Sequence, residues 1–124
     1  MKKILLASDN SVFLQVLYRS FSDLGALIDT ALTDDELMRK SLGEHYDVII
    51  TEFVSPFLNG DDLARALRRR RSKPTVFLAS RIGREEMLVS VFESGVDQYL
   101  SMPLSASRLK RKVRDELRKT EAVC

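Results

Sequence analysis

Apolar residues form short runs along the chain, and these alternate with longer stretches in which apolar positions recur every three or four residues. The short runs are typical of strands buried on both faces of a parallel sheet, and the longer stretches are typical of amphipathic helices. The runs predict strands over residues 4–7, 26–30, 47–51, 75–79 and 98–101. The longer stretches predict helices that contain residues 13–24, 33–42, 60–71, 84–94 and 105–119. Strict alternation with right-handed crossovers gives an α/β fold, a doubly wound five-stranded parallel sheet.

Two of the predicted helices show which face should be buried. The first carries its apolar residues at helical spacing and is followed by Gly25, a residue that commonly ends helices; they are Phe13, Val16, Leu17, Phe21 and Leu24. The last helix carries Leu109, Val113 and Leu117 at four-residue intervals. We expect both stripes to face the sheet.

The 124 residues suit one domain, which we expect to span residues 1–124. A composition of 44% hydrophobic and 31% charged residues is that of a soluble globular protein. No apolar run approaches the ~18 residues that span a bilayer, and the first run turns polar at Ser8, so we expect a cytoplasmic protein. A single cysteine, Cys124, and a single histidine, His45, exclude an internal disulfide and a Cys/His metal site.

The net charge of +2 conceals an asymmetry along the chain. Residues 1–62 contain five Lys/Arg and eleven Asp/Glu, whereas residues 63–124 contain fifteen and seven. A basic half can indicate an acidic binding partner, including nucleic acid.

Ligands of such sheets bind at the carboxyl ends of the strands, so the residues there are the candidates for chemistry. They are Ser8, Asp9, Asn10, Glu52, Ala79, Ser80, Ser101 and Met102. No glycine-rich phosphate-binding motif follows any predicted strand, which excludes dinucleotide and P-loop sites.

Four segments resemble the receiver domain of bacterial response regulators. They are KILLASDN (3–10), YDVIITEFVSPFLNG (46–60), PTVFLAS (74–80) and GVDQYLSMPL (95–104). The resemblance covers nearly the whole chain and implies a flavodoxin-like (βα)5 receiver fold. It also implies a two-component module, in which an acidic pair binds Mg²⁺, an aspartate accepts a phosphoryl group from a histidine kinase, and a Thr/Ser and a Lys sense that group.

The chemical positions implied by the resemblance are mostly altered in this chain. The acidic pair falls on Ser8 and Asp9, and the phosphoacceptor position is Glu52. The hydroxyl position is Ala79 and the lysine position is Met102. Only Asp9 keeps the expected chemistry, which makes the chain a degenerate pseudo-receiver.

Phosphoryl transfer depends on positioning and on charge neutralisation, and both are disturbed here. Glu52 reaches one methylene further than aspartate, and no lysine neutralises charge at position 102. We therefore expect no enzymatic phosphotransfer and no required cofactor, with Mg²⁺ binding weak or lost. Asp9 and Glu52 remain weak candidates for metal ligands.

Three functional hypotheses follow. The preferred one is a phosphorylation-independent signalling module that acts by protein–protein interaction. The second is a phosphorylatable receiver, with its acceptor at Glu52 or at a nearby Ser, and the third is a nucleic-acid contact through basic helices. Glu52 as a mimic of phosphorylated aspartate, and a former active site without a role, both stay open. Ser80 replaces the missing hydroxyl only if its side chain does not point away from that of Ala79.

Partner-binding residues are expected on the last strand and helix. Tyr99 falls where receivers often carry an aromatic residue on the partner surface, and Arg108, Arg111 and Lys112 make the last helix basic. A second basic run, Arg68 to Arg71 with Lys73, is more typical of a solvated helix end. We expect an acidic signalling partner such as a histidine kinase or an output protein. Nucleic acid is disfavoured because no aromatic stacking platform accompanies the charge, and the chain should be a monomer or a weak homodimer through its last two helices.

Overall fold

The computed structural model describes residues 1–57, 63, 66–67, 69–70, 72–80 and 95–122. Its strands form one sheet of order β2-β1-β3-β4-β5, in which every neighbouring pair is parallel. The strands are β1 (Lys3–Ala7), β2 (Leu27–Ala31), β3 (Val48–Thr51), β4 (Thr75–Ser80) and β5 (Gln98–Ser101). This confirms the predicted α/β sheet, and each strand boundary lies within one residue of its expected position.

Three α-helices are described: α1 (Ser11–Phe21), α2 (Asp34–Gly43) and α5 (Ala106–Ala122). A short 3₁₀ helix, η1 (Ser55–Phe57), follows β3. Of the predicted helix over residues 60–71, Leu63, Ala66 and Leu67 are helical, whereas Arg69 and Arg70 lie in a turn and a bend, so the predicted end at residue 71 is too late. The predicted helix over residues 84–94 lies outside the described residues. No helix within the described ranges is long and apolar enough to cross a membrane.

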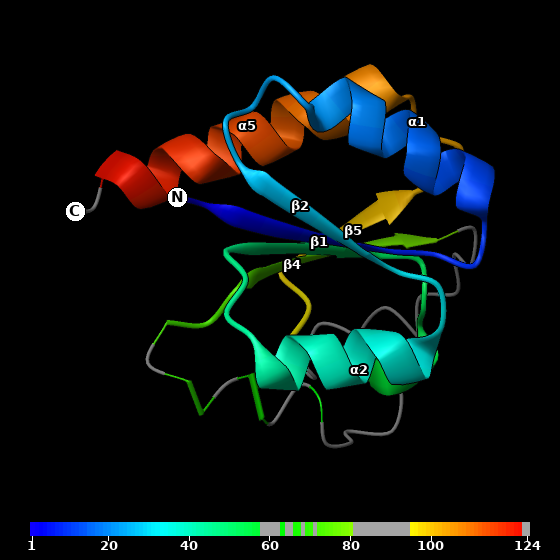
Figure 1. Cartoon of the computed structure of the whole chain (residues 1–124), viewed down its shortest axis with the longest axis vertical. Helices are drawn as coiled ribbons and strands as arrows, with labels where there is room; N and C mark the ends of the chain where they lie inside the picture. Colours follow the sequence, from blue (N-terminus) through cyan, green and yellow to red (C-terminus); the bar gives the residue numbers. More distant parts are fainter. Residues whose placement is uncertain (58–62, 64–65, 68, 71, 81–94, 123–124) are drawn as a thin grey trace.

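Both faces of the sheet are covered, as Figure 1 shows: α1 and α5 lie on one face and α2 on the other. On the α1/α5 face, alternate strand residues such as Ile4, Ile50 and Phe77 pack against the two helices. On the α2 face, the intervening residues, such as Leu5 and Ile49, form a second cluster. Burial on both faces explains why the strands read as continuous apolar runs.

The first helix differs from its prediction in two ways. It ends at Phe21, before the expected stop at Gly25, because the Ser22 N–H already turns back to the carbonyl oxygen of Arg19. Its buried face contains Leu14 in place of Val16, whose side chain is 48% exposed. Gly25 instead lies in the turn before β2 with a φ of 72°. The stripe predicted for α5 is confirmed, since Leu109, Val113 and Leu117 are buried.

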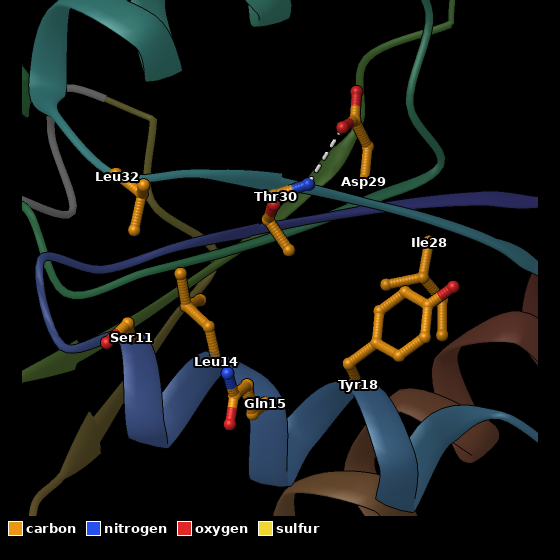
Figure 2. A pocket seen from close by; sticks show the side chains of 8 residues that line it. All are labelled: Ser11, Leu14, Gln15, Tyr18, Ile28, Asp29, Thr30 and Leu32. Atoms are coloured by element: carbon orange, nitrogen blue, oxygen red, sulfur yellow. Dashed lines mark hydrogen bonds between the residues drawn. The ribbon is translucent and has the colours of Figure 1, made fainter.

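Strand β2 forms one edge of the sheet, and charged side chains occupy its outward backbone groups. Asp29 accepts a 2.8 Å hydrogen bond from the Thr30 N–H, which Figure 2 shows beside the hollow between α1 and β2. The Lys40 ammonium donates to the Thr30 carbonyl oxygen at 2.7 Å. Glu36 accepts from the Leu32 N–H at 3.3 Å. An added strand would need these same backbone groups, so this part of the edge is closed to strand pairing.

Candidate functional site

The residues expected at the carboxyl ends of the strands lie at one edge of the sheet, because the backbone ladders continue past each strand. The Ser8 N–H donates to the Ala31 carbonyl oxygen at 3.0 Å, and the Glu52 N–H donates to that of Ala7 at 2.9 Å. On the other side, the Met102 N–H donates to the Ser80 carbonyl oxygen at 3.0 Å. The parallel register therefore holds these predicted positions on one side of the fold.

Ser8 and Glu52 are in direct contact. The Ser8 hydroxyl donates to Oε1 of Glu52 at 2.7 Å, and the Ser8 side chain is fully buried. The Ser8 oxygen in turn accepts from the Asn10 N–H at 3.0 Å. Asn10 is the N-cap of α1, where its side chain accepts from the Phe13 N–H at 3.1 Å. A continuous set of hydrogen bonds therefore connects the acceptor position on β3 to the first turn of α1.

Asp9 differs from Ser8 in its exposure to solvent. Its neighbour Ser8 is buried beneath the surface, whereas Asp9 is exposed to solvent. Among the described residues, no three His, Cys, Asp or Glu side chains are grouped closely enough to hold a metal ion. Mg²⁺ requires several hard oxygen ligands at short range, and here Oε1 of Glu52 already accepts a hydroxyl proton. Within the described residues Asp9 and Glu52 have no third such side chain beside them, and their role as weak metal ligands stays a prediction.

The two positions that would sense a phosphoryl group are apolar and belong to the core. Ala79 is fully buried in the cluster on the α1/α5 face, and Met102 packs against that cluster from the start of the loop after β5. The peptide bond between Met102 and Pro103 is cis. Strand β4 continues through Ser80, so strand alternation directs the Ser80 side chain to the face opposite Ala79. Ser80 therefore does not supply the hydroxyl that Ala79 lacks.

Tyr99 connects β5 to the end of β4. Its hydroxyl donates to the Ser80 carbonyl oxygen at 2.8 Å, and its half-buried ring packs against the cluster on the α2 face. Tyr99, the aromatic residue expected on the partner surface, is therefore bonded to the residue that follows Ala79. A rotation of this ring away from the sheet would break that hydrogen bond.

Some of the basic residues are exposed on α5, and others form contacts within the fold. Arg108, Arg111 and Lys112 are all exposed on α5. In the other basic run, the Arg70 guanidinium donates to the Glu44 carbonyl oxygen at 2.7 Å and also to that of Leu42, at the end of α2. Lys73 pairs with Asp97 at 2.7 Å. Arg68 and Arg71 lie outside the described residues. Arg108, Arg111 and Lys112 are therefore exposed candidates for partner contact, whereas Arg70 and Lys73 are engaged within the fold.

A polar cluster on the α2 side of the sheet was missed by sequence reasoning. Asp29 accepts from the Tyr46 hydroxyl at 2.8 Å and from the Lys40 ammonium at 2.9 Å. Partial burial acts to raise the pKa of Asp29, but these hydrogen bonds outweigh it and the pKa lies below its ordinary value. Burial, together with the hydrogen bonds to Asp29 and Glu44, raises the pKa of Tyr46. The only signal in the sequence is an aspartate inside an otherwise apolar strand.

Known proteins with a similar sequence were found over nearly the whole chain. A family model described as the response regulator receiver domain matches residues 4–114. The transcriptional regulatory protein ResD of Bacillus subtilis is 29% identical over 117 residues, which cover 94% of this chain and 48% of ResD. The transcriptional regulatory protein CusR of Escherichia coli K12 is 29% identical over 121 residues, which cover 98% of this chain and 53% of CusR. The chain spans about half the length of these curated relatives.

Solved structures share the same architecture. A CheY-like receiver domain protein from Methanospirillum hungatei superposes with a TM-score of 0.81 at 18% identity, covering 100% of this chain and 99% of that one. The receiver domain of the Francisella response regulator 1452 gives a TM-score of 0.78 at 27% identity, covering 97% and 99%. The parallel sheet and the residues at its carboxyl edge have the arrangement expected of the family whose model matches residues 4–114. The chain belongs to the response regulator receiver domain family, the signalling module of two-component systems.

Proposed function

We propose that this receiver is a phosphorylation-independent signalling module that acts by protein–protein interaction and does not catalyse its own phosphorylation. The observation that carries the proposal is the 2.7 Å hydrogen bond from Ser8 to Glu52. It gives the carboxylate at the acceptor position a neutral protein partner, where a receiver with an acidic pair would have a second carboxylate facing a metal ion. Signalling would then depend on a protein surface that does not change with phosphorylation.

The chemistry of the pocket supports this proposal. Transfer to a carboxylate develops charge on the phosphoryl oxygens, and that charge must be met by cations held in place before the reaction. The lysine position is Met102, which packs into the α1/α5 cluster and carries no charge. The acceptor carboxylate is one methylene longer than aspartate and is already bonded to Ser8. Misplacement of reacting groups by ~1 Å can cost ~100-fold in rate.

The same arrangement argues against Glu52 as a permanently active mimic of phosphorylated aspartate. A carboxylate shifts a two-state equilibrium only through contacts that differ between the states. The two positions that would provide such contacts, Ala79 and Met102, have no hydrogen-bonding group on their side chains and lie against the core. The bond to Ser8 supports a static role for Glu52.

The proposed partner-binding residues are Tyr99, on the edge strand β5, and the exposed cations Arg108, Arg111 and Lys112 on α5. These charges fit a signalling protein with an acidic face, such as a histidine kinase or an output protein. Binding to the phosphate backbone of a nucleic acid is less well supported. Two cations of the other basic run, Arg70 and Lys73, already contact partners within the protein. A weak homodimer through the same residues would appear as concentration-dependent sedimentation.

Incubation with acetyl phosphate and Mg²⁺, followed by intact-mass measurement, tests the proposal. Phosphorylation would form a bond between the carboxylate oxygen and phosphorus and release acetate. We expect no added phosphoryl group on the wild-type chain. A matched control carries Ser8→Asp, Glu52→Asp, Ala79→Thr and Met102→Lys in the same fold, and we expect it to gain one acid-labile, hydroxylamine-labile phosphoryl group. A wild-type chain that gains such a group on Glu52, or a stable one on a serine, would contradict the proposal.

A further inference from the structure

A second hollow lies at the end of the molecule opposite the receiver pocket. Lys2 precedes β1 and Gly25 precedes β2, so both mark the amino ends of the strands. The C-terminal half of α5 passes the same place, and Figure 1 shows the N-terminus beside that part of the helix. Together these segments enclose a hollow of about 270 Å³. None of the altered receiver positions contributes to it.

Cations dominate the walls of this hollow. Lys2, Arg114 and Arg118 line it, and Asp23 is the one carboxylate among its lining residues. Asp23 is already paired, because the Lys110 ammonium lies 2.7 Å from its Oδ1. The hydrogen bond from Lys110, and with it the charges of Lys110 and Arg114, hold the pKa of Asp23 below its ordinary value. The acidic side chain is thus matched by a lysine outside the hollow.

The lining cations form few close ion pairs with the described side chains. Lys2 lies 3.9 Å from Oδ1 of Asp47, at the limit of an ion pair, and Oδ2 of that carboxylate accepts from the Lys3 N–H. Among the side chains that the structure describes, no ion pair joins Arg114 or Arg118 to a carboxylate. Two guanidinium groups and an ammonium at one hollow favour an anion with several oxygens, because each guanidinium can donate two parallel hydrogen bonds to such a group.

The remaining walls suit a small ligand. Leu24 and Leu117 add an apolar surface, and Leu117 is buried. Gly25 adopts a φ of 72°, and a Cβ at that position would meet no atom within 4 Å. The turn therefore leaves open space beside the cations.

From this arrangement we infer that the hollow between the α1–β2 turn and α5 binds a small phosphate-type oxyanion, held by Lys2, Arg114 and Arg118. The ligand is either free inorganic phosphate or the phosphate group of a small phosphomonoester. This site is independent of the proposed signalling function, because it shares no residue with the receiver pocket or with the proposed partner-binding residues.

Titration of the ¹⁵N-labelled full chain tests the inference. Inorganic phosphate and phenyl phosphate are added separately at constant ionic strength, with chloride as the compensating ion. We expect saturable shifts of the Leu24 and Gly25 amides. The substitution Arg118→Gln should weaken binding about tenfold, since it removes a charge-assisted contact from an exposed position near the helix end. Lys2→Gln should act in the same direction.

Arg111→Gln is the matched control, because Arg111 is an exposed cation of the same helix that does not line the hollow. Its affinity for phosphate should stay within twofold of the wild type. Binding of inorganic phosphate alone identifies the free ion as the ligand, whereas equal or tighter binding of phenyl phosphate identifies a phosphomonoester that uses the apolar wall. Shifts that rise linearly without saturation, or an equal loss in the Arg111→Gln and Arg118→Gln variants, would overturn the inference.

Discussion

The Ser8 hydroxyl donates a 2.7 Å hydrogen bond to the Glu52 carboxylate and thereby joins the carboxyl ends of two adjacent strands, β1 and β3. Two departures from the receiver pattern are thus complementary to each other: one position has lost a carboxylate, and the other has gained a longer one. The Ser8 hydroxyl thus gives the Glu52 carboxylate a partner within the protein, in the place of a metal ion. Four experiments on the described residues test how the fold depends on such contacts.

Removal of the Ser8 hydroxyl should destabilise the domain. The variant Ser8→Ala leaves the Asn10 N–H and the Glu52 carboxylate without this partner, and we expect the free energy of unfolding to fall by about 1–2 kcal/mol. Urea denaturation measures the change. Ser20→Ala on α1 serves as the control, with an expected change of less than about 0.5 kcal/mol. A double-mutant cycle with Glu52→Ala should give a coupling of about 1 kcal/mol, and additive losses would show that the contact contributes nothing.

Stability should depend on the ionisation of Asp29. Because its pKa in the folded chain is lower than in the unfolded chain, its contribution is fully present above the unfolded value of about 3.9 and is lost as the pH falls through the folded value. Denaturation from about pH 7 to pH 3 should therefore show a difference between wild type and Asp29→Asn that shrinks on acidification. The partial exposure of Asp29 limits this difference to about 1 kcal/mol. Equal differences at pH 7 and pH 3 would contradict the prediction.

Two glycines should respond in opposite directions to alanine. Gly25 has a φ of 72°, so Gly25→Ala should cost about 1 kcal/mol although the space beside it is open. Gly43 is the last residue of α2 and has equally open space, so Gly43→Ala should stabilise the chain by up to about 1 kcal/mol. Thermal unfolding of both variants measures the effects. Equal shifts of the same sign would show that backbone conformation does not decide the outcome.

Arg70 should stabilise the end of α2. Its guanidinium donates to the carbonyl oxygens of Leu42 and Glu44, which the helix itself leaves without partners. We expect Arg70→Ala to lower the free energy of unfolding by about 1 kcal/mol, and amide exchange near Leu42 should quicken. Arg69→Ala, at the exposed neighbouring position, is the control with no expected loss. If the two variants unfold alike, the contact is not stabilising.

Most of the fold could be predicted because the sheet is buried on both faces. Continuous apolar runs fix strand positions closely, and all five strands were located to within one residue. The buried face of α1 was harder to predict. This helix has apolar residues almost all around it, so the stripe through Val16 was as regular as the true one through Leu14. The packing of α1 against α5 and the sheet determines which of the two stripes is buried.

The site could be predicted in position but not in its contacts. Parallel strands necessarily bring Ser8, Glu52, Ala79 and Met102 to one edge, and a family pattern reveals which residue types have changed. The hydrogen bond between Ser8 and Glu52 depends on the side-chain rotamers and on the burial of Ser8 after β1. Hydrophobic periodicity encodes neither of these. The same applies to Arg70: a run of arginines reads as a solvated helix end, and its partners lie 26 and 28 residues away.

The charged side chains along β2 affect how copies of this domain can associate through the edge of the sheet. Asp29, Lys40 and Glu36 occupy backbone groups on the outer side of the strand. A neighbouring molecule would have to displace three ionic groups before it could continue the sheet, at a desolvation cost that backbone pairing alone does not repay. The ionic side chains therefore protect the β2 edge against continuation of the sheet by a neighbouring molecule.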